Sequence, residues 1–470
     1  MNSKDWKHQP WVSMNWLETS LKVKKFPMIH WKTTTNKKKS SISIENDSSG
    51  TIQSNFLAWQ TTGALSVQYI WDHPTIKELS IVLPKQVKIT DELWMAYWRG
   101  WWLAVDAIPR QIEPFKRPNI NCSVFIETLP LSYDLWMTEY EWAKATIWVR
   151  TIQESPSNMR NPTILVRWMK EACKNVPNLH MKVYKNNSKF LSKWGGFQAI
   201  QSGSHSHGYV IELRNHKKKI SNPDVIFIGK GVNFDTGGIS LKSIKSMSLM
   251  RMDLTGALCA FALLRTFCFL QDSRSMVAIL PIVDNLIDSK SILPGSVVSL
   301  YGGPTIEITD PDAEGRILLA EASLYGQSQY PRAKEVILLA TITGIIDNVG
   351  NGLYSGLFLR TNQNLNKHNQ FWYKWRKAGE QSQEQMIELP IDDTFESLIH
   401  SKIADYVNYN EEVKSDLLWS GFFLSHFWTS KAIWNYIDLS GSIDSDIQQP
   451  WAPSIARGLG VQMVRHYLST

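Results

Sequence analysis

The chain has 470 residues, of which 43% are hydrophobic and 20% charged, so it can bury a large core and exceeds the usual length of one domain. Its formal net charge of +7 lies in residues 1–40, where nine lysines face two acidic residues, and residues 41–470 sum to zero. This balance argues against a globular part that binds nucleic acid through a general excess of positive charge. We therefore expect two globular domains behind a basic tail.

Residues 1–45 are expected to form a basic, flexible tail, because a charge run such as "NKKKSS" is usually solvated. Binding of an acidic partner is the alternative, and nucleic acid is a disfavoured partner. The tail has no arginine and carries acidic residues, which argues against a mitochondrial presequence, and it lacks the pattern of a secretory signal. Four cysteines without a CxxC motif suit reduced thiols. We expect a cytoplasmic location, with a mitochondrial one as the weaker alternative.

Residues 46–150 are expected to form a smaller N-terminal α/β domain. Short apolar runs at 78–84 and 121–130 flank the aromatic stretch "LWMAYWRGWWLAVDAIP" at 93–109. The tryptophans of this stretch could form a stacking platform for bases, but their helical spacing favours packing against a core. A helix-like segment at 139–153 then runs into "ESPSNMRNP", whose Ser, Pro and Asn residues mark a break. The domain boundary is placed there, near residue 150.

Residues 151–470 alternate helix-like and strand-like segments. "TILVRWMKEACK" at 163–174 has the pattern of a helix, and strand-like runs lie at 179–185, 208–214, 224–229, 275–283 and 335–343. Such alternation indicates an α/β domain whose sheet is covered on both faces, with binding sites at the carboxyl ends of its strands. The apolar run at 256–270 is shorter than the ~20 residues of a membrane span and contains Arg265, so we expect a buried helix and no transmembrane segment.

The glycine-rich stretch "GKGVNFDTGGISLK" at 229–242 follows directly after one of these strands. A P-loop would end in GK[ST] and a Rossmann fingerprint would read GxGxxG, and neither pattern fits. The chain has no HExxH motif and no GxSxG elbow, and "SHSHG" at 204–208 is expected to be a polar loop. A plain glycine-rich turn remains one interpretation. The other is part of a metal site, which would need further acidic residues from elsewhere in the chain.

Four carboxylates are candidates for a metal site: Asp235, Asp253, Asp312 and Glu314. Asp253 precedes the apolar helix, where an acidic cap is ordinary, and Asp312 and Glu314 could likewise be an N-cap and a first-turn acid. If the chain were still extended there, Asp312, Glu314 and Arg316 would instead point to one side. Together the four carboxylates suffice to bridge two divalent cations, and hard oxygen ligands suit Mn²⁺, Mg²⁺ or Zn²⁺.

Three blocks of the sequence resemble the signature blocks of the leucyl aminopeptidase family, the cytosol aminopeptidases. They are "GKGVNFDTGGISLK", "MSLMRMDLTGA" and "TDPDAEGRILLAEA", and further matches are "PGSVV", "LLATITG", "SKIADYVN", "WNYIDLSG" and "ARGLGVQMVRHYL". The resemblance covers residues 150–470 well and residues 1–150 only in size and character. It implies a larger C-terminal catalytic domain, residues 151–470, with a central mixed sheet flanked by helices.

The resemblance also implies a role for each site residue, position by position. The tightly held metal ion would be bound by Lys230, Asp235, Asp253 and Glu314. The second, more exchangeable ion would be bound by Asp235, Asp312 and Glu314. Lys242 would face the substrate carbonyl, and Arg316 would hold a bicarbonate ion that acts as general base. The substrate would contact Lys242 and Asp253, and its side-chain pocket is proposed to contain Met250, Thr343 and Ile345.

The implied activity is dimetal hydrolysis of the first peptide bond in peptides with a free amino terminus, preferably after leucine or another apolar residue. An activated hydroxide would attack the carbonyl, because divalent cations lower the pKa of bound water from ~16 toward ~7. The family also implies a homohexamer. The alternative is a catalytically impaired relative with a structural or binding role, which would not require Lys242 or Arg316.

The chain departs from the family pattern at two places beside these ligands. Where the family has NTDAEGR, this chain has "DPDAEGR", in which Pro311 removes a backbone donor and restricts Asp310. Leu254 and Thr255 stand where the family has a methionine and a glycine. Both changes could alter metal affinity or crowd the backbone near the ligands.

Overall fold

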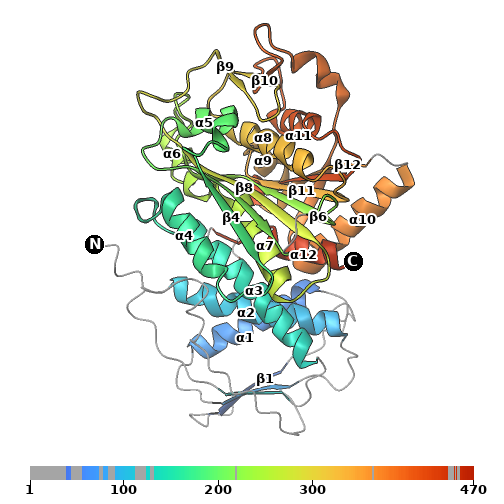
Figure 1. Cartoon of the computed structure of the whole chain (residues 1–470). Helices are drawn as coiled ribbons and strands as arrows, with labels where there is room; N and C mark the ends of the chain where they lie inside the picture. The colour runs from blue at the N-terminus through green and yellow to red at the C-terminus, as the bar shows by residue number, and fades with distance from the viewer. Residues whose placement is uncertain are drawn as a thin grey trace. The chain divides into compact units, whose positions relative to one another are not determined.

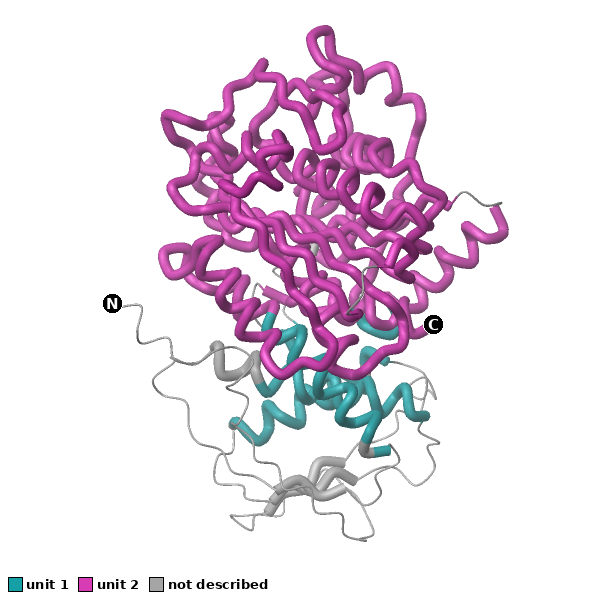
Figure 2. Tube along the Cα trace, in the orientation of Figure 1, with its two compact units in different colours: residues 1–148, 380–383, 447–455 teal, residues 149–379, 384–446, 456–470 magenta. Residues whose placement is uncertain are grey.

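The computed structural model describes residues 39–43, 56–72, 78–82, 90–111, 123–126, 132–216, 220–361, 365–442, 449, 451–452 and 456–470. Contacts divide the chain into two compact units (Figure 2). Unit 1 comprises residues 1–148, 380–383 and 447–455, and unit 2 comprises residues 149–379, 384–446 and 456–470. The first division falls inside helix α3 (Tyr133–Gln153). The basic run of residues 1–38 lies outside the described residues, whereas Lys39–Ser43, also assigned to the tail from the sequence, forms strand β1.

Unit 1 contains a parallel sheet and a pair of packed helices. The strands, in spatial order, are β1, β2 (Glu78–Val82) and β3 (Ser123–Ile126). Helix α1 (Phe56–Asp72) packs against helix α2 (Asp91–Gln111), which contains the aromatic stretch.

The tryptophans of α2 form the core of unit 1. Trp94, Trp98 and Trp101 are at most 2% exposed, and Trp98 meets Tyr97 and Trp101 edge to face. Arg99 on the same helix is also buried, with its Nε 3.5 Å from a carboxylate oxygen of Glu139. A platform for bases would need exposed ring faces, so the prediction of core packing is confirmed and the stacking alternative is wrong.

The core of unit 2 is a mixed sheet, nine-stranded within the described residues. Its spatial order is β13 (Gln385–Leu389), β12 (Tyr354–Arg360), β15 (Ile433–Asp438), β11 (Glu335–Ala340), β6 (Val225–Gly229), β8 (Met276–Asn285), β5 (Tyr209–Arg214) and β4 (His180–Lys185), with β7 (Gly231–Asp235) also paired to β8. The central strands β15, β11, β6 and β8 are parallel, and β12 and β5 are antiparallel to them. The mixed sheet and the five strand-like runs are confirmed.

Helices cover both faces of this sheet (Figure 1). Helix α7 (Thr255–Phe269) packs on β6, β8 and β11, and α12 (Val461–Ser469) packs on α7. The other face carries α5 (Gly195–Gln201) and α8 (Glu314–Gln329), with α11 (Asp416–His426) packed on α8. Because both faces are covered, every residue of β8 is buried, and this is why the central strands are mostly apolar.

Helix α7 is the buried helix predicted at residues 256–270. Its residues from Thr255 to Cys268 are buried, and Arg265 is accommodated because its Nε donates to Ala172 O at 3.0 Å. Among the described residues, the stretch Ile244–Phe269 is long and apolar enough to cross a membrane, but 94% of its most apolar window is buried inside the structure. The stretch is also divided into α6 (Ile244–Met247), a 3-10 turn η4 (Met250–Met252) and α7. A core helix accounts for it.

The remaining elements of unit 2 surround the sheet. A small second sheet contains β14 (Tyr406–Val407), β10 (Thr305–Ile308) and β9 (Ser296–Ser299). Three further helices are α4 (Pro162–Ala172), α9 (Ile345–Gly350) and α10 (Leu365–Ser382), and further 3-10 turns are η2 (Ser157–Met159), η3 (Leu191–Lys193), η5 (Asp393–Leu398) and η6 (Ser440–Ser442). The side chain of Asn161 caps α4 by accepting from Ile164 N at 2.9 Å, which confirms a helix at the predicted place.

Candidate metal centre

The carboxyl ends of neighbouring strands bring the first candidate ligands together. Lys230 lies between β6 and β7, and its backbone is fixed because its N–H donates to Leu339 O at 3.0 Å and its carbonyl accepts from Ala257 N at 2.8 Å. Asp235 is the last residue of β7, and Asp253 lies just before α7. The site therefore lies at strand ends, where an α/β sheet is expected to place it.

Asp235 is oriented by its own hydrogen bonds. Its Oδ1 accepts from Asn285 Nδ2 and from Gly237 N, both at 2.8 Å. Asn285 ends β8 and also donates to Pro311 O at 3.1 Å, so one amide links Asp235 to the turn that carries Asp312. Gly237 has a φ of +87°, and a side chain there would meet Asp312 Oδ1 at 2.9 Å.

The turn between β10 and α8 carries Asp312. Asn408 holds this turn, because its Oδ1 accepts from Thr309 N at 2.8 Å and its Nδ2 donates to Asp310 O at 2.6 Å. The side chain of Asp310 in turn accepts from Asp312 N at 2.9 Å. Pro311 fits here because the turn uses its carbonyl, which accepts from the amide that orients the neighbouring ligand.

Helix α8 begins at Glu314, immediately after this turn. Strand β10 ends at Ile308, so the extended alternative for this segment is wrong, and Glu314 and Arg316 lie in the first turn of a helix. Glu314 is the first-turn acid that the sequence allowed, but Ala313 rather than Asp312 is the N-cap. The backbone reverses between Ile308 and Glu314, and this reversal brings Asp312 and Glu314 to the same site.

Six charged side chains converge here: Asp235, Asp253, Asp312, Glu314, Lys230 and Lys242. One carboxylate oxygen from each of Asp235, Asp312 and Glu314 lies within 4.8 Å of the others. Lys230 Nζ is 2.8 Å from Asp253 Oδ1 and 2.8 Å from Glu314 Oε1. Lys242 Nζ is 2.9 Å from Asp235 Oδ2 and also pairs with Asp312 Oδ1. The structure thus brings every predicted ligand into one cluster.

The cluster concentrates negative charge in a buried place. Burial and the neighbouring carboxylates of Asp235 and Glu314 raise the pKa of Asp312 to about 8. Burial by itself lowers the pKa of Lys230, but the carboxylates of Asp253 and Glu314 outweigh burial and raise that pKa above its ordinary value. A neutral Lys230 amine, which a metal ligand requires, therefore depends on cations that compete for the same carboxylates.

Some buried carboxylate oxygens of the cluster have no hydrogen-bond partner, and these show whether divalent cations fit the cluster. Asp253 is 6% exposed and Glu314 is 1% exposed, yet Asp253 Oδ2 and Glu314 Oε2 find no hydrogen-bond donor within the described part of the chain. A buried acceptor left unpaired costs about 1–3 kcal/mol, and more when it is charged. Carboxylate oxygens at this density suit Mn²⁺, Mg²⁺ or Zn²⁺, so the residues present fit the predicted cations.

Lys230 runs beside the first turn of α8. Gly315 leaves room for it, because a Cβ at Gly315 would lie 2.7 Å from Lys230 Cε and 2.8 Å from its Cδ. Lys230 Nζ donates to Thr341 O at 2.7 Å, and Thr341 Oγ1 donates to Asp253 Oδ1 at 2.7 Å. The loop that carries Thr341 is held by Asp438, which accepts from two of its backbone N–H groups at 3.3 and 3.2 Å.

Arg316 is paired with a carboxylate that the sequence argument did not single out. Its Nη2 donates to both carboxylate oxygens of Asp416 at 2.8 Å, and its Nη1 donates to Asn408 O at 3.2 Å. The side chain of Arg316 is 2% exposed and that of Asp416 is 25% exposed. The donors present therefore do not fit a bicarbonate ion at Nη2, which Asp416 already occupies.

A cavity of about 320 Å³ opens beside the cluster. Its charged wall is formed by Lys230, Lys242, Asp310, Asp312, Glu314, Arg316 and Asp416. Thr343 and Ile345, which were predicted for the substrate side-chain pocket, also line it. Met250 lies in η4 and is not among the described residues of this wall.

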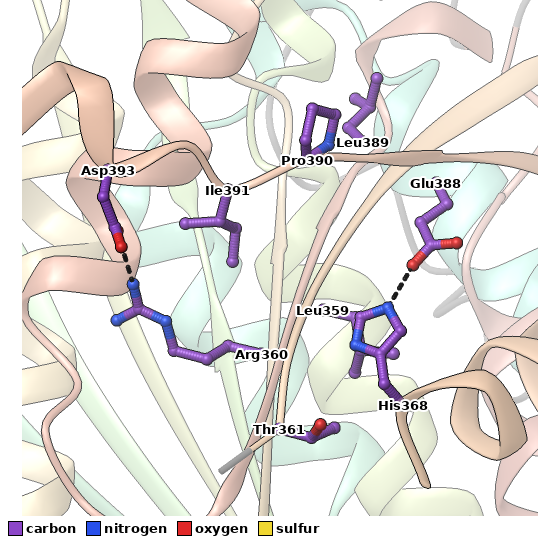
Figure 3. Close-up of a pocket in the computed structure, with 9 residues that line it drawn as sticks. All are labelled: Leu359, Arg360, Thr361, His368, Glu388, Leu389, Pro390, Ile391 and Asp393. Atoms are coloured by element: carbon purple, nitrogen blue, oxygen red, sulfur yellow. Dashed lines mark hydrogen bonds and ion pairs between the residues drawn. The ribbon is translucent and has the colours of Figure 1, made fainter. Parts of the chain in front are cut away.

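A second cavity, of about 550 Å³, lies beside β12 and the edge strand β13 (Figure 3). A hydrogen bond and an ion pair line it: His368 Nε2 is 2.6 Å from Glu388 Oε1, and Arg360 Nη2 is 3.8 Å from Asp393 Oδ1. None of the described residues that line this cavity is a predicted ligand or substrate contact. It is separate from the metal centre.

Four residues that orient the site were missed in the sequence: Asn285, Thr341 and Asn408, which hold candidate ligands or their turn, and Asp416, which holds Arg316. Asn285 lies two residues after the strand-like run at 275–283, and an amide at that position is a signal that could have been used. Asp416 follows Ser415 at the start of an apolar run, which is an ordinary helix beginning, so nothing in the sequence set it apart. Leu254 and Thr255 fit beside Asp253, since Thr255 Oγ1 donates to Met252 O at 2.6 Å and accepts from an amide of α3 at 2.7 Å.

The fold and the cluster define a class: an α/β protein with an oxygen-rich site for divalent cations at the strand ends of a mixed sheet. Comparison with known families makes this more specific. Residues 147–465 match the model of the cytosol aminopeptidase family, catalytic domain. The chain therefore belongs to the cytosol aminopeptidase family, and the resemblance stated from its sequence blocks is confirmed.

Bacterial relatives match the same part of the chain. A probable cytosol aminopeptidase of Rickettsia rickettsii (strain Sheila Smith) is 28% identical over 329 residues, which cover 69% of this chain and 64% of that protein. A probable cytosol aminopeptidase of Legionella pneumophila (strain Corby) is 28% identical over 330 residues, covering 69% and 66%. The chain thus spans less than two thirds of the length of these relatives.

Solved structures share the fold. The bottromycin maturation enzyme BotP in complex with Mn is 22% identical with a TM-score of 0.77, and the likeness covers 88% of this chain and 87% of that one. The cytosol aminopeptidase from Coxiella burnetii is 23% identical with a TM-score of 0.74, covering 88% and 84%. At sequence identities this low, the similarity shows a shared fold and nothing further.

Proposed function

We propose that this protein is a metal-dependent aminopeptidase that releases amino acids from the amino terminus of peptides. One observation carries the proposal: oxygens of Asp235, Asp312 and Glu314 lie within 4.8 Å of one another in a buried cluster that also contains Lys230 and Asp253. A cavity of about 320 Å³ beside the cluster leaves space for a substrate. Membership of the cytosol aminopeptidase family supports the same activity.

Two divalent cations, Zn²⁺ or Mn²⁺ with Mg²⁺ as a further option, are proposed to bind at the sites expected from the sequence. Lys230, Asp235, Asp253 and Glu314 would hold one, and Asp235, Asp312 and Glu314 the other. When bound, such cations lower the pKa of water from ~16 toward ~7 and polarise a carbonyl oxygen. The buried, unpartnered oxygens of Asp253 and Glu314 support this ligand set.

Lys242 is proposed to stabilise negative charge on the substrate carbonyl oxygen. Both lysines line the cavity, and the side chain of Lys242 is the more exposed, at 15% against 4% for Lys230. A well-placed donor in such a position lowers the barrier by about 3–4 kcal/mol. Asp253 is proposed to bind the amino group of the substrate, because it is a buried carboxylate with an unpartnered oxygen. That contact would restrict cleavage to the first residue.

A preference for leucine or another apolar residue is proposed from the wall of the cavity, where Ile342, Thr343 and Ile345 lie beside the charged residues. Met250 keeps its proposed place at the substrate as an inference from family resemblance. The same resemblance supports a homohexamer in the cytoplasm that acts on peptides with a free amino terminus.

The purified protein loaded with Mn²⁺ is expected to hydrolyse leucyl amides, and Asp312→Ala or Glu314→Ala is expected to remove both the activity and bound metal. Asp405→Ala is the control, because Asp405 is an exposed carboxylate that contacts Thr305 and no site residue. Metal content is measured on the same samples. If metal-loaded wild type turns over no peptide with a free amino terminus, the alternative holds, a catalytically impaired relative with a structural or binding role.

A further inference from the structure

The guanidinium of Arg316 is bound by a carboxylate of the chain itself. Both oxygens of Asp416 accept from Arg316 Nη2 at 2.8 Å, and the Nη1 group is fixed by Asn408 O at 3.2 Å. Arg316 is 2% exposed, so this charge-assisted pair is largely shielded from water on the arginine side. The anion partner of Arg316 is therefore tethered to the fold.

Asp416 also faces the substrate cavity. It is the first residue of α11, it is 25% exposed, and it lines the cavity together with Lys242 and Asp312. Each carboxylate oxygen has lone pairs beyond the one that accepts from Arg316. Asp416 can thus keep its ion pair and still take a hydrogen bond from a group in the cavity.

We propose that Asp416 takes the place of bicarbonate in this protein, so that the hydrolysis needs no added anion on Arg316. The inference rests on the proposed aminopeptidase function. The attacking water forms a bond to the carbonyl carbon and loses a proton to Asp416, and the same proton passes to the leaving nitrogen when the C–N bond breaks. Asp416 is regenerated, and no further reactant is required.

A second anion on Arg316 is disfavoured by charge. The Nε of Arg316 is buried and has no hydrogen-bond partner in the described part of the chain, so its N–H group could still donate to an anion. However, Asp416 is bound to the same guanidinium and Glu314 lies two residues away, and both carboxylates repel a further negative charge in a buried place. Bicarbonate is therefore expected to bind only when the carboxylate of Asp416 is removed.

The first test measures leucyl amide hydrolysis by the full-length, metal-loaded protein in carbonate-free buffer, with and without bicarbonate. Wild type is expected to be indifferent to bicarbonate. Asp416→Gly is expected to lose about 10²–10⁴-fold in turnover, the usual contribution of a general base, and to recover part of it with bicarbonate or formate. Asp416→Asn is expected to lose as much without recovery, because its amide still fills the space beside Arg316.

The second test measures anion binding without turnover. With Mg²⁺ in place of paramagnetic Mn²⁺, the line width of ¹³C-bicarbonate is expected to increase with Asp416→Gly and to stay unchanged with wild type and Asp416→Asn. The double variant Asp416→Gly/Arg316→Met should abolish the broadening, which places the anion on Arg316.

Two outcomes overturn the proposal: stimulation of wild type by bicarbonate, or loss of activity in Asp416→Gly that no small anion restores while the variant remains folded by circular dichroism. Failure of the proposed function looks different. In that case no variant and no condition gives turnover, and the line-width measurement still decides whether Asp416 excludes bicarbonate from Arg316.

Discussion

Two lysines of the metal centre differ in burial and therefore in expected role. Both line the cavity, but Lys230 is 4% exposed and lies between Asp253 and Glu314, whereas Lys242 is 15% exposed and pairs with Asp235 and Asp312. In the proposed mechanism the same residue type would thus serve as a buried ligand in one place and as a charge next to substrate in the other. Substituting each by methionine, which has a similar length and no charge, separates these roles.

Lys242→Met is expected to lower kcat for a leucyl amide by about 10²–10³-fold, the usual cost of removing one oxyanion donor. Its metal content should not fall, because removing an ammonium group from Asp235 and Asp312 leaves more negative charge for cations. Lys230→Met should instead lower metal content, since it removes a ligand. Steady-state kinetics and metal analysis of both variants check this, and equal metal loss in both would contradict the division of roles.

Asn285 orients a proposed metal ligand and is not itself one, because its amide donates to Asp235 and to the turn before α8. Asn285→Ala is expected to weaken metal binding by about 10–100-fold, the usual effect of losing a residue that orients a ligand. Asn435→Ala is the matched control: this asparagine is equally buried, but its amide bonds Glu335 and Val336, away from the site. Titration of metal-free protein with Mn²⁺ measures both, and equal weakening would show a general loss of stability.

At the scale of elements, the first turn of helix α8 packs closely against the side chain of Lys230, and this contact leaves no room for a side chain at Gly315. Gly315→Ala would place a Cβ 2.7 Å from Lys230 Cε and from Ile342 Cδ1, so we expect a loss of about 1–3 kcal/mol in the free energy of unfolding, together with weaker metal binding. Gly326→Ala in the same helix meets only the end of a flexible side chain, Ile279 Cδ1, at 3.1 Å.

The Gly326→Ala control is expected to be close to neutral or stabilising by up to about 1 kcal/mol, because alanine favours helices over glycine. Urea denaturation of both variants gives the comparison. Equal destabilisation by the two substitutions would mean that contact with Lys230 does not set the requirement for glycine at position 315.

The strands of unit 2 could be predicted from the sequence because burial on both faces makes them continuous apolar runs, as in β8 and β11. The start of α8 was harder to predict. An alternation of Asp312, Glu314 and Arg316 suits a strand as well as a helix start, and the deciding contacts come from Asn408, about a hundred residues further on.

The candidate ligands could be predicted from motif spacing, since each follows a strand or precedes a helix that periodicity reveals. The residues that orient these ligands and Arg316 were harder to predict. Asn285 and Asn408 act through single amides that reach across the site, and Asp416 has an ordinary place at a helix start. For Asn408 and Asp416 the local sequence carries no sign of the partner that the tertiary fold supplies.

At the scale of the whole molecule, all the proposed ligands belong to unit 2, while unit 1 has a tryptophan-rich core of its own. A ligand that binds only the native state stabilises the part that folds to bind it. Added metal is therefore expected to stabilise only those parts of the chain that unfold together with the site, and comparing regions with and without metal identifies them.

Mn²⁺ at about 100 times its dissociation constant is expected to stabilise unit 2 by about 2.7 kcal/mol. Hydrogen–deuterium exchange followed by mass spectrometry, in urea below the unfolding midpoint, should show slower exchange in β6, β8 and β11 on adding Mn²⁺, with α2 of unit 1 little changed. Asp312→Ala should remove the effect, because it deletes a ligand but leaves both cores intact. Equal slowing in α2 and in β6 would instead mean that the two units unfold as a single cooperative body, and metal affinity would then control the stability of the entire chain.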